Sequence, residues 1–231
     1  MNGGINSVKE SAAKSRTKSK IPQIAEAVFC ILYLVFGYIS SFVFYSNFAN
    51  NSILILYVFL TMILVCGDSF HLVPRIINAF MEYFEKYEFW AGLGLLISSI
   101  SMTVYYFVLF YICQEISGGI IKNSAVKYGL FILGTIRIIL CLFPQNNWFK
   151  SEGNIKWGII RNVPFVFVGI IMMCVSCASG LINLAVAIFL SFAFYLPVVL
   201  FGKKNPKVGM LMIPKTIAYV YMICMGFSFL G

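Results

Sequence analysis

Apolar stretches of about 20 residues recur from residue 21 to the end of the chain, and they constrain the fold more than any other feature. A helix needs about 20 residues to cross the ~30 Å hydrocarbon core of a bilayer. Of the 231 residues, 61% are hydrophobic and 11% are charged, and the mean hydropathy is +0.91. Soluble domains contain about a quarter charged residues. The sequence therefore predicts an integral membrane protein.

Turn signals divide the apolar sequence into seven helical runs, so the predicted fold class is an all-α bundle of seven transmembrane helices over residues 21–231. We expect the polar, basic residues 1–20 to form a disordered tail and the aromatic and charged segment 78–90 to lie at the membrane interface. The predicted spans are residues 22–46, 52–76, 90–114, 126–144, 157–178, 182–202 and 208–230.

The Lys and Arg residues predict an orientation, because the short cytoplasmic loops of membrane proteins carry an excess of both. Thirteen of the 17 lie in the tail or around the loops after the second, fourth and sixth spans. Only Lys122 and Lys127 lie on the other side, and Arg137 and Lys215 lie within spans. We therefore predict a cytoplasmic N-terminus and an outside C-terminus. Membrane topology also explains the net charge of +9, and no nucleic-acid partner is expected.

Polar residues of several spans converge on one predicted depth. At ~1.5 Å per residue, Asp68 lies ~24 Å from the start of its span at Ser52, several ångströms inside the cytoplasmic boundary. A charged side chain in hydrocarbon costs at least ~2.5 kcal/mol, so such residues normally face the bundle interior. We therefore expect a cavity open to the cytoplasm. The same level is reached by Ser98, Ser99, Ser101, Arg137, Arg161, Asn162, Tyr195 and Lys215.

The segment "GDSFHLVPRI", residues 67–76, contains the two catalytic candidates, Asp68 and His71. Asp68 is expected to form an ion pair with Arg137, and His71 is either an acid–base group or a hydrogen-bonded structural side chain. The cations of the spans outnumber Asp68 and the possible second acid, Glu26, which favours an anionic guest. Arg75 and Arg161 are shallow enough to reach the lipid headgroups instead. The ligand-binding candidates are Arg75, Arg137, Arg161, Asn162, Tyr195 and Lys215.

Metal and cofactor sites are not expected. Zinc-dependent membrane hydrolases that resemble alkaline ceramidases need three His ligands, and this chain has one. Lys215 lies near the cytoplasmic end of its span, which disfavours a retinal protein. Six of the seven Cys residues fall in apolar runs, so Cys174 and Cys177 are interpreted as packing residues rather than a redox pair.

Six segments together resemble a family of seven-span bacterial membrane proteins without an assigned activity. That resemblance covers nearly the whole chain and implies a multi-pass protein of the bacterial cytoplasmic (inner) membrane. The segments are "GDSFHLVPRI", "SSISMTVYY", "LCLFPQNNW", "RNVPFVFVG", "SFAFYLPVV" and "MLMIPKTIAY".

A second resemblance is to the YhhN-type lysoplasmalogenases, in which a Gly-Asp pair ends an early span, as in "GDSFHL", before a helix like "FWAGLG" to "TVYYF". It implies hydrolysis of a lysoplasmalogen vinyl ether, with Asp68 as acid or base and with Arg137 and Lys215 holding the phosphate. The family has more than one intramembrane acid, and here only Glu26 is available as the second.

We therefore expect a basic, cytoplasm-facing pocket for an anionic lipid headgroup or metabolite, in a lysolipid hydrolase or, alternatively, in a non-enzymatic binder or transporter. An enzyme would need Asp68 or His71 for turnover, whereas a binder would need mainly the cations. No half of the sequence resembles the other, which counts against a transporter built from repeats. The expected partners are the lipid bilayer and an anionic ligand, and the sequence predicts no oligomeric state.

Overall fold

The computed structural model describes residues 3–81, 87–119, 124–149, 154–202 and 206–230. Within these ranges the chain is helical and contains no strand. The main helices are α1 Gly3–Asn47, α2 Ser52–Phe80, α3 Tyr87–Ile116, α4 Ser124–Leu142, α5 Ile155–Ala178, α6 Ile182–Phe201 and α7 Met212–Cys224. Short 3₁₀ helices extend α7 at both ends, at Pro206–Leu211 and Met225–Phe229.

Seven helical segments of the described chain are long and apolar enough to cross a membrane. The predicted all-α bundle of seven helices is confirmed, and each predicted span end lies within four residues of the observed one. The segments are Gln23–Asn47, Ser52–Phe80, Tyr87–Ile116, Ser124–Leu142, Ile155–Ala178, Ile182–Phe201 and Val208–Phe229.

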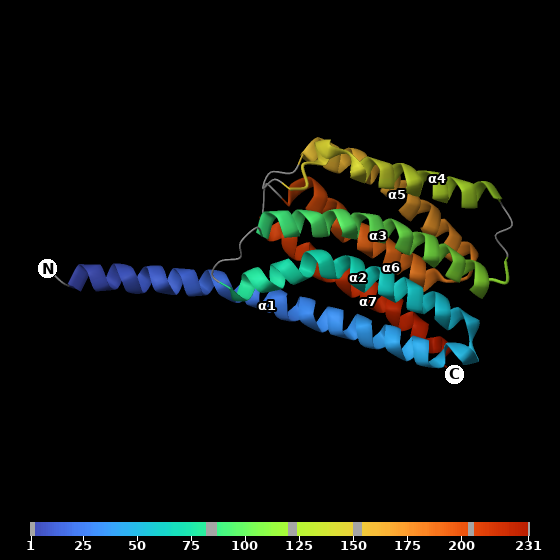
Figure 1. Ribbon diagram of the computed structural model, residues 1–231, viewed down its shortest axis with the longest axis horizontal. Helices are drawn as coiled ribbons and strands as arrows, with labels where there is room; N and C mark the ends of the chain where they lie inside the picture. The colour runs from blue at the N-terminus through green and yellow to red at the C-terminus, as the bar shows by residue number, and fades with distance from the viewer. Residues whose placement is uncertain (1–2, 82–86, 120–123, 150–153, 203–205, 231) are drawn as a thin grey trace.

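Helix α1 differs from the expectation for the N-terminal tail. The helix begins at Gly3 and runs without interruption into the first span, so residues 3–20 are helical where disorder was expected. Figure 1 shows this part of α1 projecting beyond the bundle. Ala, Lys, Glu and Arg, which are frequent between residues 9 and 20, are all good helix formers. The interface segment 78–90 lies partly outside the described residues; α2 takes up its first turn and ends at Phe80.

Consecutive helices pack side by side, and α1 closes the bundle against α7 (Figure 1). Helix α4 packs mainly against α3 and α5. The two chain ends lie at opposite ends of the bundle. We call the end at which α1 enters, and at which α2, α4 and α6 finish, the N-terminal end.

Asparagine side chains cap the N-termini of two helices. The Asn51 side chain accepts a hydrogen bond from the backbone N–H of Ile53 (3.0 Å), and Asn154 accepts from those of Lys156 and Trp157 (3.0 and 3.4 Å). Such caps satisfy donors that the first turn of a helix leaves free. They fix where α2 and α5 begin after their loops.

Helices α2 and α3 approach each other most closely at two glycines. A Cβ atom on Gly94 of α3 would overlap the backbone of Phe70, and one on Gly67 of α2 would overlap the side chain of Ser101. The Phe70 carbonyl lacks its normal helical partner, because Pro74 has no N–H to donate. The contact of Gly94 with this carbonyl sets the distance between the two helices beside the candidate site.

The half of the bundle away from the N-terminal end is an apolar core. It is filled by large side chains such as Phe44, Leu54 and Leu109, all fully or almost fully buried. Buried hydroxyls there donate to their own helix, as Ser40 does to the Phe36 carbonyl (2.7 Å) and Ser176 to the Met172 carbonyl (2.8 Å). No buried charged side chain lies in this half among the described residues. The charged candidates therefore belong to the N-terminal half alone.

Candidate functional site

Asp68 lies where α1, α2 and α3 meet in the N-terminal half. The Tyr33 hydroxyl of α1 donates to its Oδ2 atom (2.9 Å), and the Ser98 hydroxyl of α3 donates to its Oδ1 atom (2.8 Å). The contact at Gly94, one helical turn before Ser98, brings α3 close enough for the second bond. The carboxylate thus has both oxygens hydrogen-bonded, and its side chain is only 15% exposed. This arrangement fixes the orientation of the carboxylate.

His71 follows Asp68 by one turn on the same face of α2. Its Nδ1 atom lies 3.9 Å from Asp68 Oδ1, which is too long for a hydrogen bond. The side chain is 10% exposed, and Nδ1 has no hydrogen-bond partner among the described residues. The structure therefore places the two catalytic candidates together but leaves this ring nitrogen without a protein partner there.

A small inner cavity of about 30 Å³ lies beside Asp68 and His71, between α1, α2 and the start of α7. One water needs at least about 10–15 Å³ of such volume, so this cavity has room for about two. Its lining includes Lys215, which was expected at the same depth. The polar or titratable side chains in the lining are Glu26, Cys30, Tyr33, Asp68, His71, Arg75, Lys215, Thr216 and Tyr219.

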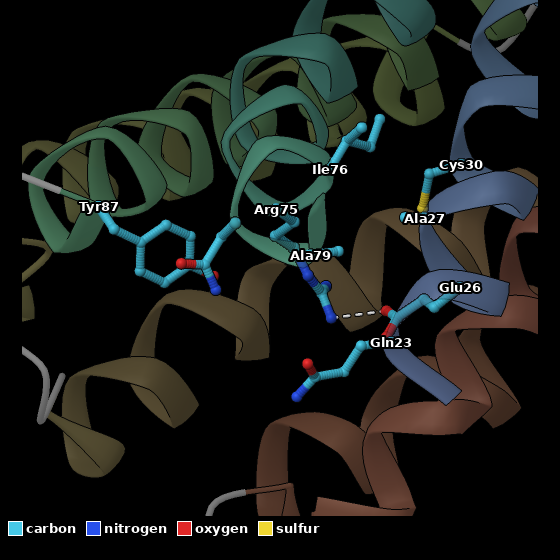
Figure 2. Close-up of a pocket in the computed structure, with 9 residues that line it drawn as sticks. Gln23, Glu26, Ala27, Cys30, Arg75, Ile76, Ala79 and Tyr87 are labelled. Atoms are coloured by element: carbon cyan, nitrogen blue, oxygen red, sulfur yellow. Dashed lines mark hydrogen bonds and ion pairs between the residues drawn. The ribbon is translucent and has the colours of Figure 1, made fainter. Parts of the chain in front are cut away.

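A larger outer cavity of about 180 Å³ lies closer to the N-terminal end. Figure 2 shows Arg75 of α2 pointing toward Glu26 of α1 in its wall, with Tyr87 on the far side. Arg75 Nη2 donates to Glu26 Oε1 at 2.6 Å, and the two side chains are 40% and 35% exposed. Because Glu26, Cys30 and Arg75 also line the inner cavity, this ion pair belongs to the wall of both. The outer lining is completed by Gln23, Ala27, Ile76, Asn78 and Ala79.

Lys215 of α7 reaches the inner cavity between two tyrosines. Its Nζ atom lies 4.8 Å from the centroid of the Tyr195 ring and 5.4 Å from that of the Tyr219 ring. Aromatic faces attract an ammonium group at such distances. Among the described residues Lys215 forms no ion pair within 4 Å, so its charge is compensated mainly by these ring faces and by the carboxylates that share the cavity.

The predicted ion pair between Asp68 and Arg137 is wrong. Arg137 of α4 donates from Nη1 to the Thr103 hydroxyl (2.8 Å), and its guanidinium lies 3.3 Å from the centroid of the Phe165 ring. The residue is 2% exposed and has no ion pair in the described part of the chain. Helix α4 packs mainly against α3 and α5, away from the α1–α2 side where Asp68 lies. The two residues share a depth but not a cavity.

Arg161 is also placed away from both cavities. Its Nη1 atom donates to Asn146 Oδ1 (2.7 Å), and its guanidinium lies 4.0 Å from the Trp148 ring centroid. The buried Asn146 amide donates in turn to the carbonyls of Leu140 (2.8 Å), Cys141 (3.3 Å) and Phe143 (2.8 Å). The last carbonyls of a helix have no partner within it, and a cation there is favourable. Arg161 therefore has a structural role as part of the C-terminal cap of α4.

Asn162 and Tyr195 join α5 to α6 beside the cavities without lining either one. The Tyr195 hydroxyl donates to Asn162 Oδ1 (2.9 Å), and Asn162 Nδ2 donates to the Gly158 carbonyl (2.7 Å). The Tyr195 ring lies under the Lys215 ammonium. The hydrogen bond to Asn162 therefore helps to hold the Tyr195 ring in contact with the Lys215 ammonium.

The charges around the cavities are balanced, contrary to the expected excess of cations. Glu26 and Asp68 face Arg75 and Lys215, because Arg137 and Arg161 lie elsewhere. Residues missed from the sequence include Tyr33, which binds Asp68, and Tyr219, which contacts Lys215. The position of Tyr33 could have been predicted from its spacing from Glu26. Positions i, i+4 and i+7 of one helix share a face, and here they are occupied by Glu26, Cys30 and Tyr33.

No model of a protein family, no curated protein and no solved structure matches the chain. The two family resemblances inferred from sequence therefore stay hypotheses.

Proposed function

We propose that the seven helices cross the cytoplasmic membrane of a bacterium, with the N-terminal end of the bundle in the cytoplasm and the C-terminus outside. The distribution of Lys and Arg in the sequence supports this orientation. The outer cavity then lies nearer the cytoplasmic lipid headgroups, and the inner cavity lies deeper in the same half of the membrane.

In that setting the chain binds the phosphate-bearing headgroup of a lipid or lysolipid. The observation that carries this proposal is the outer cavity, which contains an ion pair in its wall and lies at the N-terminal end of a bundle whose other half is apolar. Arg75 supplies a planar donor suited to a phosphate, and Lys215 adds a second positive charge farther in. Sites for drug-sized ligands measure about 300–1,000 Å³, so a cavity of about 180 Å³ suits a small headgroup.

The apolar half of the bundle supports binding over transport. A transported solute must cross the whole membrane, and intramembrane polar residues normally mark its path. Here the buried charged groups among the described residues lie on one side of the core formed by Phe44, Leu54 and Leu109. A site in one leaflet fits a lipid ligand, whose acyl chain stays in the membrane.

The test uses native mass spectrometry of the purified protein with a lysophospholipid and with a monoacylglycerol of the same acyl chain, which lacks the phosphate. We expect the lysophospholipid to bind about tenfold more tightly, and Arg75→Gln to remove most of that preference, since a hydrogen bond to a charged group contributes ~1.5–3 kcal/mol. Lys156→Gln, which removes an exposed cation outside both cavities, is the matched control. Equal binding of the two lipids by the wild type would refute phosphate recognition.

A second candidate function is hydrolysis of a lysolipid vinyl ether, favoured by the inner cavity next to Asp68 and His71. In its protonated form Asp68 would donate its proton to the enol-ether carbon, a water would attack the resulting oxocarbenium carbon, and the carboxylate would take up a proton from that water. In the hemiacetal so formed, the bond between this carbon and the glycerol oxygen breaks and the hydroxyl proton passes to that oxygen, which releases an aldehyde and the glycerophospho-headgroup.

The hydrolysis test compares aldehyde release by the wild type with that by Asp68→Asn. A lost acid–base group lowers turnover by roughly 10²–10⁴-fold. Ser99→Ala is the control, because the Ser99 hydroxyl donates to the Leu95 carbonyl of its own helix (2.7 Å) and does not contact Asp68. Equal turnover by wild type and Asp68→Asn would show that Asp68 is structural, and no turnover by the folded wild type would exclude hydrolysis of the lipids tested.

A further inference from the structure

The Glu26–Arg75 pair restricts the kind of headgroup that the outer cavity can bind. Arg75 is the nearest cation for a phosphate in this cavity, and its Nη2 atom already donates to Glu26 at 2.6 Å. A phosphate that takes over Arg75 leaves the Glu26 carboxylate without this donor and close to a second negative charge. Like charges at such a distance repel, and the repulsion is stronger where water is partly excluded.

A headgroup with a positive charge of its own removes this cost. A phosphate on Arg75 and an ammonium on Glu26 would together replace the ion pair, and every charge would keep a partner of opposite sign. Specificity of this kind comes from the penalty on the wrong ligand as much as from the attraction of the right one. The same balance holds deeper in the site, where Asp68 and Lys215 both line the inner cavity.

Glu26 is the carboxylate available to such an ammonium. Asp68 already accepts hydrogen bonds from Tyr33 and Ser98, and its cavity of about 30 Å³ is too small for a headgroup. Glu26 is 35% exposed and faces the larger cavity. Because Glu26 now accepts a charge-assisted N–H bond from Arg75, a replacement of equal strength must also donate an N–H. A quaternary ammonium has none.

We propose, on the basis of the phosphate-binding function above, that the outer cavity selects a ligand in which a primary ammonium lies a few bonds from a phosphate, with the phosphate on Arg75 and the ammonium on Glu26. An ethanolamine phosphate headgroup has this chemistry, as part of a lipid or as the free phosphoethanolamine.

The test is competition in native mass spectrometry among three lysolipids with the same acyl chain: lysophosphatidylethanolamine, lysophosphatidylcholine and lysophosphatidylglycerol. We expect the wild type to bind the ethanolamine lipid about tenfold more tightly than either of the others, the effect of one hydrogen bond to a charged group. Glu26→Gln keeps the size of the side chain and should lower this preference to about twofold or less. Glu115→Gln, an exposed acid at the far end of α3, should leave it unchanged.

The outcomes separate this inference from the function on which it rests. Tight binding of all three lipids with no preference for ethanolamine, or a preference that survives in Glu26→Gln, would overturn the inference and leave phosphate binding intact. Binding of none of them would overturn both. Competition by free phosphoethanolamine at the concentration of the lysolipid would support the same recognition with a soluble ligand, whereas its failure to compete would support a lipid. The wild-type comparison needs no variant, so poor folding of Glu26→Gln would not remove the test.

Discussion

Replacing Gly94 by alanine should destabilise the bundle, because α2 and α3 touch through this residue. The added Cβ would overlap the Phe70 carbonyl and lie 2.5 Å from the Cα atom of His71. These are backbone atoms, which cannot rotate away as a flexible side chain can. Helix α3 must therefore move off α2, and Ser98, one turn farther along, would move away from Asp68.

Two opposing effects determine how much Gly94→Ala changes the free energy of unfolding. Overpacking costs about 1–3 kcal/mol, while alanine gains about 1 kcal/mol over glycine inside a helix. Gly129 of α4 offers a matched control, since a Cβ there has no neighbour within 4 Å. Gly94→Ala should thus be less stable than Gly129→Ala by about 1–3 kcal/mol, the overpacking cost alone, because both variants gain the same helix propensity.

The assay is thermal unfolding of the two variants in the same detergent. At roughly 2–4 °C per kcal/mol for a chain of this size, Gly94→Ala should melt about 2–12 °C below Gly129→Ala. Equal melting temperatures would refute the close approach of α2 and α3, and with it the account of how Ser98 reaches Asp68.

Three further predictions concern residues around the site and the orientation of the bundle. Arg137→Met should change the free energy of unfolding by about 1 kcal/mol or less, because the lost contacts with Thr103 and Phe165 are offset by removing a buried cation that has no ion pair among the described residues. Denaturant unfolding measures this free energy, and a loss above about 3 kcal/mol would contradict the prediction. Asn146→Ala should lower stability by about 2–4 kcal/mol in the same assay, since its amide donates to three carbonyls that end α4; an unchanged midpoint would argue against the cap. A membrane-impermeant thiol reagent applied outside the cell should label Asn50→Cys and not Lys204→Cys, and the reverse pattern would invert the proposed orientation.

Depth along a helix could be predicted from the sequence, and position around the bundle could not. A rise of ~1.5 Å per residue placed Asp68, Arg137 and Lys215 at one level. Asp68 and Lys215 do share a cavity. Arg137 lies on the far side, because α4 packs mainly against α3 and α5, and the order of helices around a bundle depends on packing that no single helix encodes.

The spacing of polar residues along a single helix predicts which of them share a face. Asp68, His71 and Arg75 are spaced i, i+3 and i+7, which predicts one face of α2, and all three line the inner cavity. Glu26 and Arg75 are 49 positions apart in the sequence and lie on different helices, so their ion pair depends on how α1 packs on α2. The role of Asn146 depends on the path of the chain after α4, which the sequence "PQNNW" marks only as a turn.

A structure determined with a bound lysophospholipid would test most directly whether the outer cavity binds a phosphate-bearing headgroup. Headgroup phosphate density in the outer cavity, within hydrogen-bonding distance of Arg75, is the predicted result. The apolar surface groove between α6 and α7, lined by Val186, Leu190 and Ile217, is the alternative place for a lipid. Lipid density in that groove, with no phosphate beside Arg75, would contradict the account.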